Sequence, residues 1–112
     1  MKIRVHHLDK VCVLEPQGPI VHPLGDRSLR DQIRDETGAG ERHFVLDMAG
    51  VPYIDSVGVG ELIASLKRVR ESGGDIKLAA VSQRVSDTLL LLRLVSILEI
   101  YASREEAIAA FI

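Results

Sequence analysis

Short apolar runs alternate with amphipathic stretches from Phe44 to the end of the chain, and this alternation constrains the fold more than any other feature. The runs at residues 44–46, 76–81 and 98–101 are short and apolar enough to be buried strands. Between and after them, apolar residues recur every three or four positions, which is the period of a helix buried on one face. Strands that alternate with helices form sheets through right-handed crossovers, so the sequence predicts an α/β domain.

Three helices follow from this pattern. The first ends at a glycine pair, Gly73-Gly74. The second is predicted after Ser82, a residue type that caps helices, and the third after Ser103, which has capping-box spacing to Glu106. Their apolar faces are expected to pack on the sheet, through Val59, Leu62, Ile63, Leu66 and Val69 in the first helix and Val85, Leu89 and Leu92 in the second.

The first third of the chain predicts two neighbouring strands and a short helix. Apolar residues at 3–8 and 11–14 form two runs that are close enough to pair as a hairpin, which would make the sheet a mixed one. Residues 26–36 are polar except for Leu29 and Ile33, four positions apart, and this is typical of a short exposed helix.

The composition excludes several classes of partner and setting. A chain of 112 residues that is 46% hydrophobic and 27% charged fits one globular domain and not a disordered segment. Its net charge of -2 gives no attraction to nucleic acid or to an anionic membrane. The single cysteine, Cys12, rules out an internal disulfide. Because we find neither a signal-peptide pattern nor an apolar run of membrane length, we expect a cytoplasmic protein without membrane insertion.

The stretch VPYIDSVGVGEL, residues 51–62, places two glycines just after a serine and a carboxylate. A dinucleotide fingerprint would need a third glycine where the chain has Ile63. A nucleophile elbow would need a glycine where the chain has Ile54. The histidines have no spacing that implies a catalytic base, and they form neither a pairing with the cysteine nor a helical His-x-x-x-His pattern of the kind that binds metal. We therefore expect no catalytic residue, no cofactor and no metal site.

Two interpretations of Ser56 remain open at this point. In one, the serine is a modification target, because free N–H groups at a helix start favour negative charge and Gly58 and Gly60 leave room for a partner's active site. In the other, which spacing alone favours, Ser56 is an N-cap and the glycines permit a tight turn.

Residues 44–111 resemble the STAS domain, the family named for sulfate transporters and anti-sigma factor antagonists. The resemblance rests on an apolar strand ending Leu46-Asp47, on Ile54-Asp55-Ser56 followed by Gly58 and Gly60, on an amphipathic helix, and on the Gly73-Gly74 turn. It implies one STAS-like α/β domain over residues 1–112, with a mixed central β-sheet and helices packed mainly on one face.

The resemblance also implies a function. Stand-alone domains of this family look like anti-sigma factor antagonists, in which the serine after the motif aspartate is phosphorylated by a partner that is both serine kinase and anti-sigma factor. The unphosphorylated form binds that partner and frees the sigma factor, and a metal-dependent serine phosphatase removes the phosphate. When the family's motif is aligned with this sequence, the phosphorylated residue is Ser56, and Asp55 would orient its hydroxyl or contact the kinase. The expected partner-binding residues are Asp47, Asp55, Ser56, Val57, Gly58 and Gly60.

The sequence departs from the family pattern in two places. Family members often carry a second hydroxyl residue at the position of Val57, so Ser56 is the only hydroxyl of this motif. Residues 19–28 do not follow the family's usual acidic segment, which often contributes to the partner surface. Two other roles stay open, an accessory subunit of a lipid-transport ATPase and a scaffold subunit of a stress-sensing assembly, and so does a homodimer.

Three further residues or runs have structural interpretations. Asp47 at a strand end is expected to cap the following loop. Cys12 within an apolar strand is expected to be a buried thiol that acts as a small hydrophobe. The four leucines at 89–92 cannot all face one side of a helix, so either the helix is covered on both sides or one or two leucines are exposed, where they could serve self-association or a partner.

Overall fold

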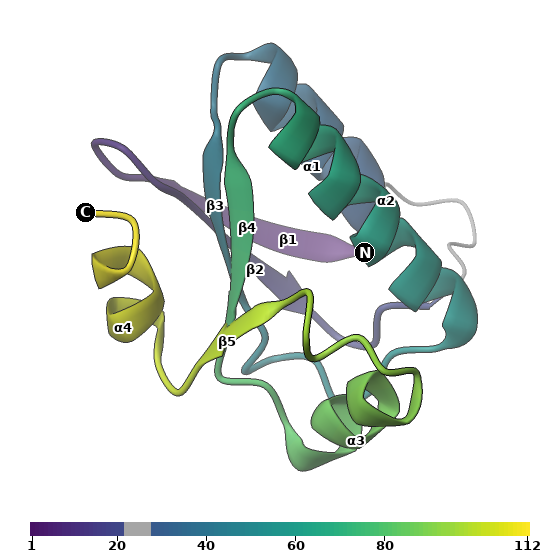
Figure 1. Ribbon diagram of the computed structural model, residues 1–112. Helices are drawn as coiled ribbons and strands as arrows, with labels where there is room; N and C mark the ends of the chain where they lie inside the picture. The colour runs from purple at the N-terminus through teal and green to yellow at the C-terminus, as the bar shows by residue number, and fades with distance from the viewer. Residues whose placement is uncertain (22–27) are drawn as a thin grey trace.

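The structure is a computed structural model of the chain, and it describes residues 1–21 and 28–112. Within these residues, five strands form one sheet and four helices surround it (Figure 1). The elements follow in the order β1 (Lys2–His7), β2 (Cys12–Gln17), α1 (Leu29–Gly38), β3 (His43–Asp47), α2 (Ser56–Glu71), β4 (Asp75–Ala79), α3 (Gln83–Leu91), β5 (Glu99–Tyr101) and α4 (Arg104–Ala109).

The strands lie side by side in sequence order, β1-β2-β3-β4-β5. β1 pairs antiparallel with β2, and the other neighbours are parallel, so the sheet is mixed as predicted. A tight turn, in which the Leu8 N–H donates to the Val11 carbonyl at 2.9 Å, joins β1 to β2. Because each later crossover advances the sheet by one strand in the same direction and has the same hand, α1, α2 and α3 are directed to one face.

The two faces of the sheet bury cores of different size. The larger core lies under α1, α2 and α3, where Phe44 and Leu46 of β3 meet Leu62 and Leu66 of α2. The alternate residues of the strands face α4, and Val45 there packs in a smaller cluster whose members are Val11, Val13, Val45, Ala79 and Ala107. The prediction that helices pack mainly on one face is confirmed, and α4 is the helix on the opposite face (Figure 1).

The predicted helix starts agree with the capping residues that the structure shows. Ser82 accepts from the Val85 N–H at 3.2 Å and Ser103 accepts from the Glu106 N–H at 3.2 Å. Ser28 caps α1, so that helix begins at Leu29. The first residues of the helix predicted over 26–36 belong to the segment 22–27, which lies outside the described residues. None of the described helices is long and apolar enough to cross a membrane.

The prediction for the leucine run was wrong. Only Leu89 of the four is buried, so three leucines are exposed rather than one or two, and Leu91 reaches 82%. Leu90 and Leu91 lie within α3 but off the face that buries Val85 and Leu89. Leu92 was predicted to share that face, but it is the C-cap, where the helix ends, and it is exposed. Arg93 then turns the chain with a φ of 59°.

Candidate functional site

The serine and carboxylate of the 51–62 stretch lie at the start of α2. Asp55 is the N-cap, and its Oδ1 accepts a hydrogen bond of 2.7 Å from the Gly58 N–H. Ser56 is the first helical residue and its side chain is exposed. The interpretation of Ser56 as the N-cap was therefore wrong, because the carboxylate one residue earlier satisfies the orphan N–H group. No described residue hydrogen-bonds the Ser56 hydroxyl.

The two glycines after Ser56 have different roles. Gly58 is buried, and a Cβ there would overlap the carbonyl group of Ile20. Ile20 is held in that place by two backbone bonds, from its own N–H to the Tyr53 carbonyl at 3.1 Å and from the Asp55 N–H to its carbonyl at 3.2 Å. Gly58 thus makes room for the protein's own backbone and not for a partner. Among the described residues, a Cβ at Gly60 would meet no atom within 4 Å, so this glycine leaves an open surface on that part of the structure.

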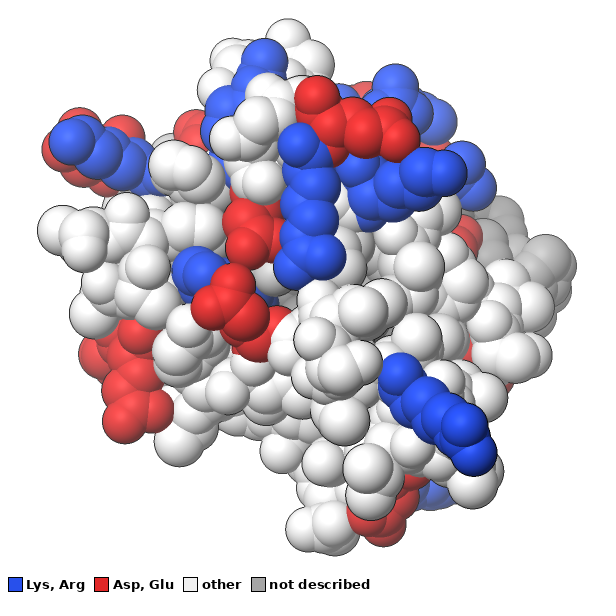
Figure 2. Space-filling view, in the orientation of Figure 1, with Lys and Arg blue, Asp and Glu red and all other residues white. Residues whose placement is uncertain are grey.

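Apolar side chains are exposed on either side of Ser56. Val57 is 44% exposed and Tyr53 is 36% exposed. The Arg84 guanidinium of α3 lies over the Tyr53 ring at 4.6 Å, so α3 borders the same surface. Figure 2 shows that basic side chains gather over α1 and α2, whereas uncharged side chains predominate around α3. Ser56 is therefore a neutral hydroxyl at a positive helix end, with exposed apolar side chains nearby.

Asp47 lies apart from the surface formed by Ser56, Val57 and Tyr53. It ends β3 with its side chain on the face that carries α4, whereas α2 lies on the other face. Its Oδ1 accepts from the Ala49 N–H at 3.1 Å, which confirms the predicted loop cap. Its Oδ2 accepts from the Arg104 Nε at 3.0 Å and Nη2 at 2.9 Å, and Arg104 also pairs with Glu15. Sequence alone gave no sign of this ion pair, because its partners are 57 positions apart.

Groups that could hold a metal ion lie elsewhere in the fold. Among the residues that the structure describes, one cluster of His, Cys and Glu side chains has such a geometry, at His7, Cys12 and Glu36. These residues lie at the β1–β2 hairpin and at the end of α1, away from the start of α2.

A family profile, a related sequence and solved structures all show similarity to STAS domains or anti-sigma factor antagonists. The sequence profile described as the STAS domain matches residues 2–107. A protein of Bordetella bronchiseptica, BtrV, named as a candidate anti-sigma factor antagonist, is 28% identical over 111 residues, which cover 99% of this chain and 95% of the relative.

Two solved structures show the same fold. The crystal structure of a candidate anti-sigma factor antagonist from Thermotoga maritima has a TM-score of 0.84 at 24% identity, over 96% of this chain and 92% of that one. The anti-sigma factor antagonist SpoIIAA in its unphosphorylated form has a TM-score of 0.74 at 18% identity, over 98% of this chain and 96% of that one.

Proposed function

The chain belongs to the STAS domain family, and from this premise we propose that it is an anti-sigma factor antagonist switched by phosphorylation of Ser56. Sequence similarity to BtrV over almost the whole of both chains supports the regulatory role. One local observation supports the switch. Ser56 is exposed at a helix start, and the N-cap of that helix is Asp55 and not Ser56. The serine hydroxyl is therefore not used by any residue that the structure describes, and its exposure makes it accessible to a kinase.

The unphosphorylated protein binds an anti-sigma factor, which is also the serine kinase. The binding surface is the exposed start of α2, with Ser56, Val57 and Gly60, together with Tyr53 in the preceding loop. Exposed apolar and aromatic side chains are the kind that contribute most to protein–protein binding once they are desolvated. Binding occupies the anti-sigma factor and thereby releases the sigma factor.

Phosphorylation changes this surface while leaving the fold in place. A phosphate on Ser56 adds about -1.5 to -2 charges at neutral pH, and the positive end of α2 stabilises them in the free protein. In the complex the same charges would have to be desolvated against a surface that fits an uncharged hydroxyl. Each 1.4 kcal/mol of that penalty weakens binding about tenfold, so a few kcal/mol abolish a tight complex.

The protein itself acts as a binding module in the cytoplasm and not as an enzyme. The serine is a substrate for the partner kinase, and a metal-dependent serine phosphatase restores the binding form. SpoIIAA, which shares the fold, is named in its unphosphorylated form, and this supports a cycle between two states of the serine.

The test is the affinity of four forms of the protein for the purified serine-kinase anti-sigma factor of the source cell. Ser56→Ala should bind as tightly as the parent, because it removes only a hydroxyl. Ser56→Asp should bind more weakly, and the phosphorylated protein should bind most weakly, since it carries the larger charge. The matched control is Ser96→Asp, which places the same charge at another exposed serine outside any helix start and should leave binding unchanged.

A second measurement locates the modification. Incubation with the kinase and ATP, followed by peptide mass spectrometry, should find one phosphate on the parent and none on Ser56→Ala. Phosphate transferred to Ser56→Ala, or equal affinity of all four forms, would remove Ser56 from the mechanism.

A further inference from the structure

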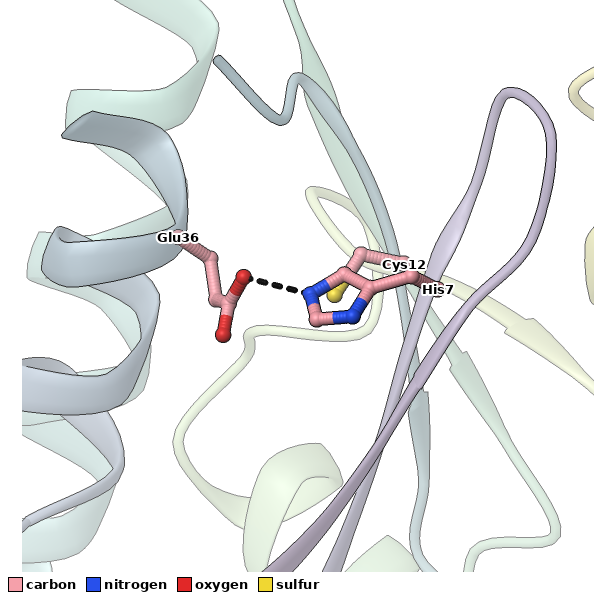
Figure 3. Close-up of side chains that lie close together, drawn as sticks. All are labelled: His7, Cys12 and Glu36. Carbon is pink, nitrogen blue, oxygen red and sulfur yellow. Dashed lines mark hydrogen bonds and ion pairs between the residues drawn. The ribbon is translucent and has the colours of Figure 1, made fainter. Parts of the chain in front are cut away.

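Three metal-ligand side chains converge where the β1–β2 hairpin meets the last turns of α1. His7 ends β1 and is the register partner of Cys12, which begins β2, so the two side chains lie on the same face of the hairpin. Glu36 reaches them from α1, and its Oε1 lies 2.7 Å from the His7 Nε2. Figure 3 shows the ring and the carboxylate pointing toward each other, with the Cys12 sulfur beside the ring.

We propose that His7, Cys12 and Glu36 form a binding site for a divalent transition-metal ion such as Zn²⁺. One nitrogen, one sulfur and one carboxylate oxygen are a donor set that suits zinc. Zinc is four-coordinate, so three protein ligands leave its fourth position to water. The proposal goes beyond the regulatory function, and it concerns the opposite end of the sheet from Ser56.

The distances among the donors are close to those that a zinc ion requires. One ligand atom from each of the three residues lies within 4.8 Å of the others. Zinc–ligand bonds of about 2.0 to 2.3 Å at tetrahedral angles place ligand atoms about 3.3 to 3.8 Å apart. The His7 Nε2 and Glu36 Oε1 atoms, now 2.7 Å apart, must separate by about 0.6 to 1 Å, and any donor pair near the 4.8 Å limit must close by about 1 to 1.5 Å. Small side-chain rotations supply shifts of this size without moving the backbone.

The surroundings orient the donors and leave a path for the ion. The Gln32 side chain donates to Glu36 Oε2 at 2.9 Å, which holds the carboxylate with Oε1 toward His7. Such bonds to a ligating carboxylate are a regular feature of metal sites. The thiol of Cys12 is fully buried, whereas the side chain of His7 is 56% exposed, so the site is closed on the core side and open at the hairpin.

The negative charges near Cys12 disfavour a free thiolate there, but they favour a bound dication. Burial, followed by the charges of Glu36 and Glu41, raises the pKa of the Cys12 thiol to about 12, so the thiol is protonated at neutral pH. The Glu36 carboxylate, through its hydrogen bond and its charge, raises the pKa of His7. A dication reverses this balance, because a neutral imidazole, a thiolate and a carboxylate around it sum to zero charge. The bound ion displaces the thiol proton to solvent.

A purely structural role for the same residues predicts a different result. In that case His7 and Glu36 would form only a surface ion pair and Cys12 would serve only as a small hydrophobe. Neither role involves a metal, so titration with metal separates the two.

The experiment is a titration of the reduced full chain with Co²⁺, followed by displacement with Zn²⁺. One Co²⁺ should bind per chain and give a thiolate-to-cobalt charge-transfer band, which Zn²⁺ should abolish by replacing the cobalt. Cys12→Ala should lose the band. His7→Gln and Glu36→Gln should each weaken Zn²⁺ binding at least about tenfold, since even partners of ligands contribute that much.

His6→Gln is the matched control. His6 lies one residue away on the other face of β1, where its Nε2 is 3.2 Å from Glu15 Oε1, so this variant should bind cobalt like the parent. Circular dichroism checks the fold of every variant. If Cys12→Ala fails to fold, the variants of the two partly exposed ligands, His7→Gln and Glu36→Gln, still test the site. The absence of a charge-transfer band in the parent would overturn the site, as would equal loss of Zn²⁺ binding in His6→Gln and His7→Gln.

Discussion

The carboxyl end of β3 and the opposite end of the sheet present reactive side chains in different ways. Toward the carboxyl end, the chain continues into α2, and Ser56 is exposed with its hydroxyl unused by the described residues. At the other end, Cys12 is fully buried, and His7 and Glu36 reach it from separate elements. The first site is contiguous in sequence and depends on one helix start, whereas the second exists only after a hairpin and a helix have packed together.

This difference determines what each end requires of the backbone. The Ser56 end depends on the close approach of Ile20 to Gly58, which fixes the loop before α2. The Cys12 end depends on register, because a shift of one residue in the β1–β2 pairing would direct the cysteine or the histidine to the other face. Local substitutions should therefore affect one end without the other.

The largest effect is expected from Gly58→Ala. Its Cβ would overlap backbone atoms of Ile20, which can move only by breaking the bonds that hold it, so the variant should lose about 1 to 3 kcal/mol of unfolding free energy. Gly60→Ala is the control: it lies in the same helix with open space around it and should gain about 0.5 to 1 kcal/mol. Urea denaturation of both variants measures the contrast, and equal stabilities would contradict the role assigned to Ile20.

A smaller effect is expected from Asp55→Ala. Loss of the carboxylate that accepts from the Gly58 N–H should cost about 0.5 to 2 kcal/mol, as for other N-caps. Asp55→Asn keeps an acceptor oxygen and should recover most of that loss. Ser56→Ala should stay within about 0.5 kcal/mol of the parent, because its side chain is exposed. If thermal unfolding showed Ser56→Ala to be as destabilised as Asp55→Ala, the two residues would share the capping role.

The sequence predicted those parts of the fold whose signals are local. The helix caps at Ser82 and Ser103 follow from residue type and spacing within one turn. The burial of β3 follows from its continuous apolar run, residues 44–46. The STAS motif likewise lies in one stretch, so Ser56 could be located at the start of α2 without the structure.

Features that depend on contact between distant residues were missed. The spacing of His7 and Cys12, with four residues between them, does not match a metal motif, and only the hairpin turn makes the two residues register partners. Gly58 was assigned to a partner's approach because nothing in the sequence shows that Ile20 lies against it. The end of α3 at Leu91, which leaves Leu92 off the buried face, is followed by the left-handed conformation of Arg93, a residue type that rarely adopts it.

The smallest effect is expected for coupling between the two ends. The five residues of β3 separate them by about 16 Å at 3.3 Å per residue. A bound dication that releases the thiol proton adds one positive charge to its site, which about two negative charges on Ser56 would attract by about 0.5 kcal/mol at that distance in water. Physiological salt screens this attraction to about 0.1 kcal/mol or less. Zn²⁺ affinity should therefore differ less than about twofold between the parent and the phosphorylated protein.

Ionic strength separates this weak electrostatic coupling from a conformational one. At about 0.01 M salt the Debye length grows to about 30 Å, so phosphorylation should strengthen Zn²⁺ binding by a factor of about 1.7, and by linkage Zn²⁺ should favour the phosphorylated form equally. Coupling through a change of shape would persist at high salt, because it depends on packing and not on charge. A tenfold effect in 0.15 M salt would mean that the sheet transmits a structural change from one end to the other, and the two sites would then act as one switch.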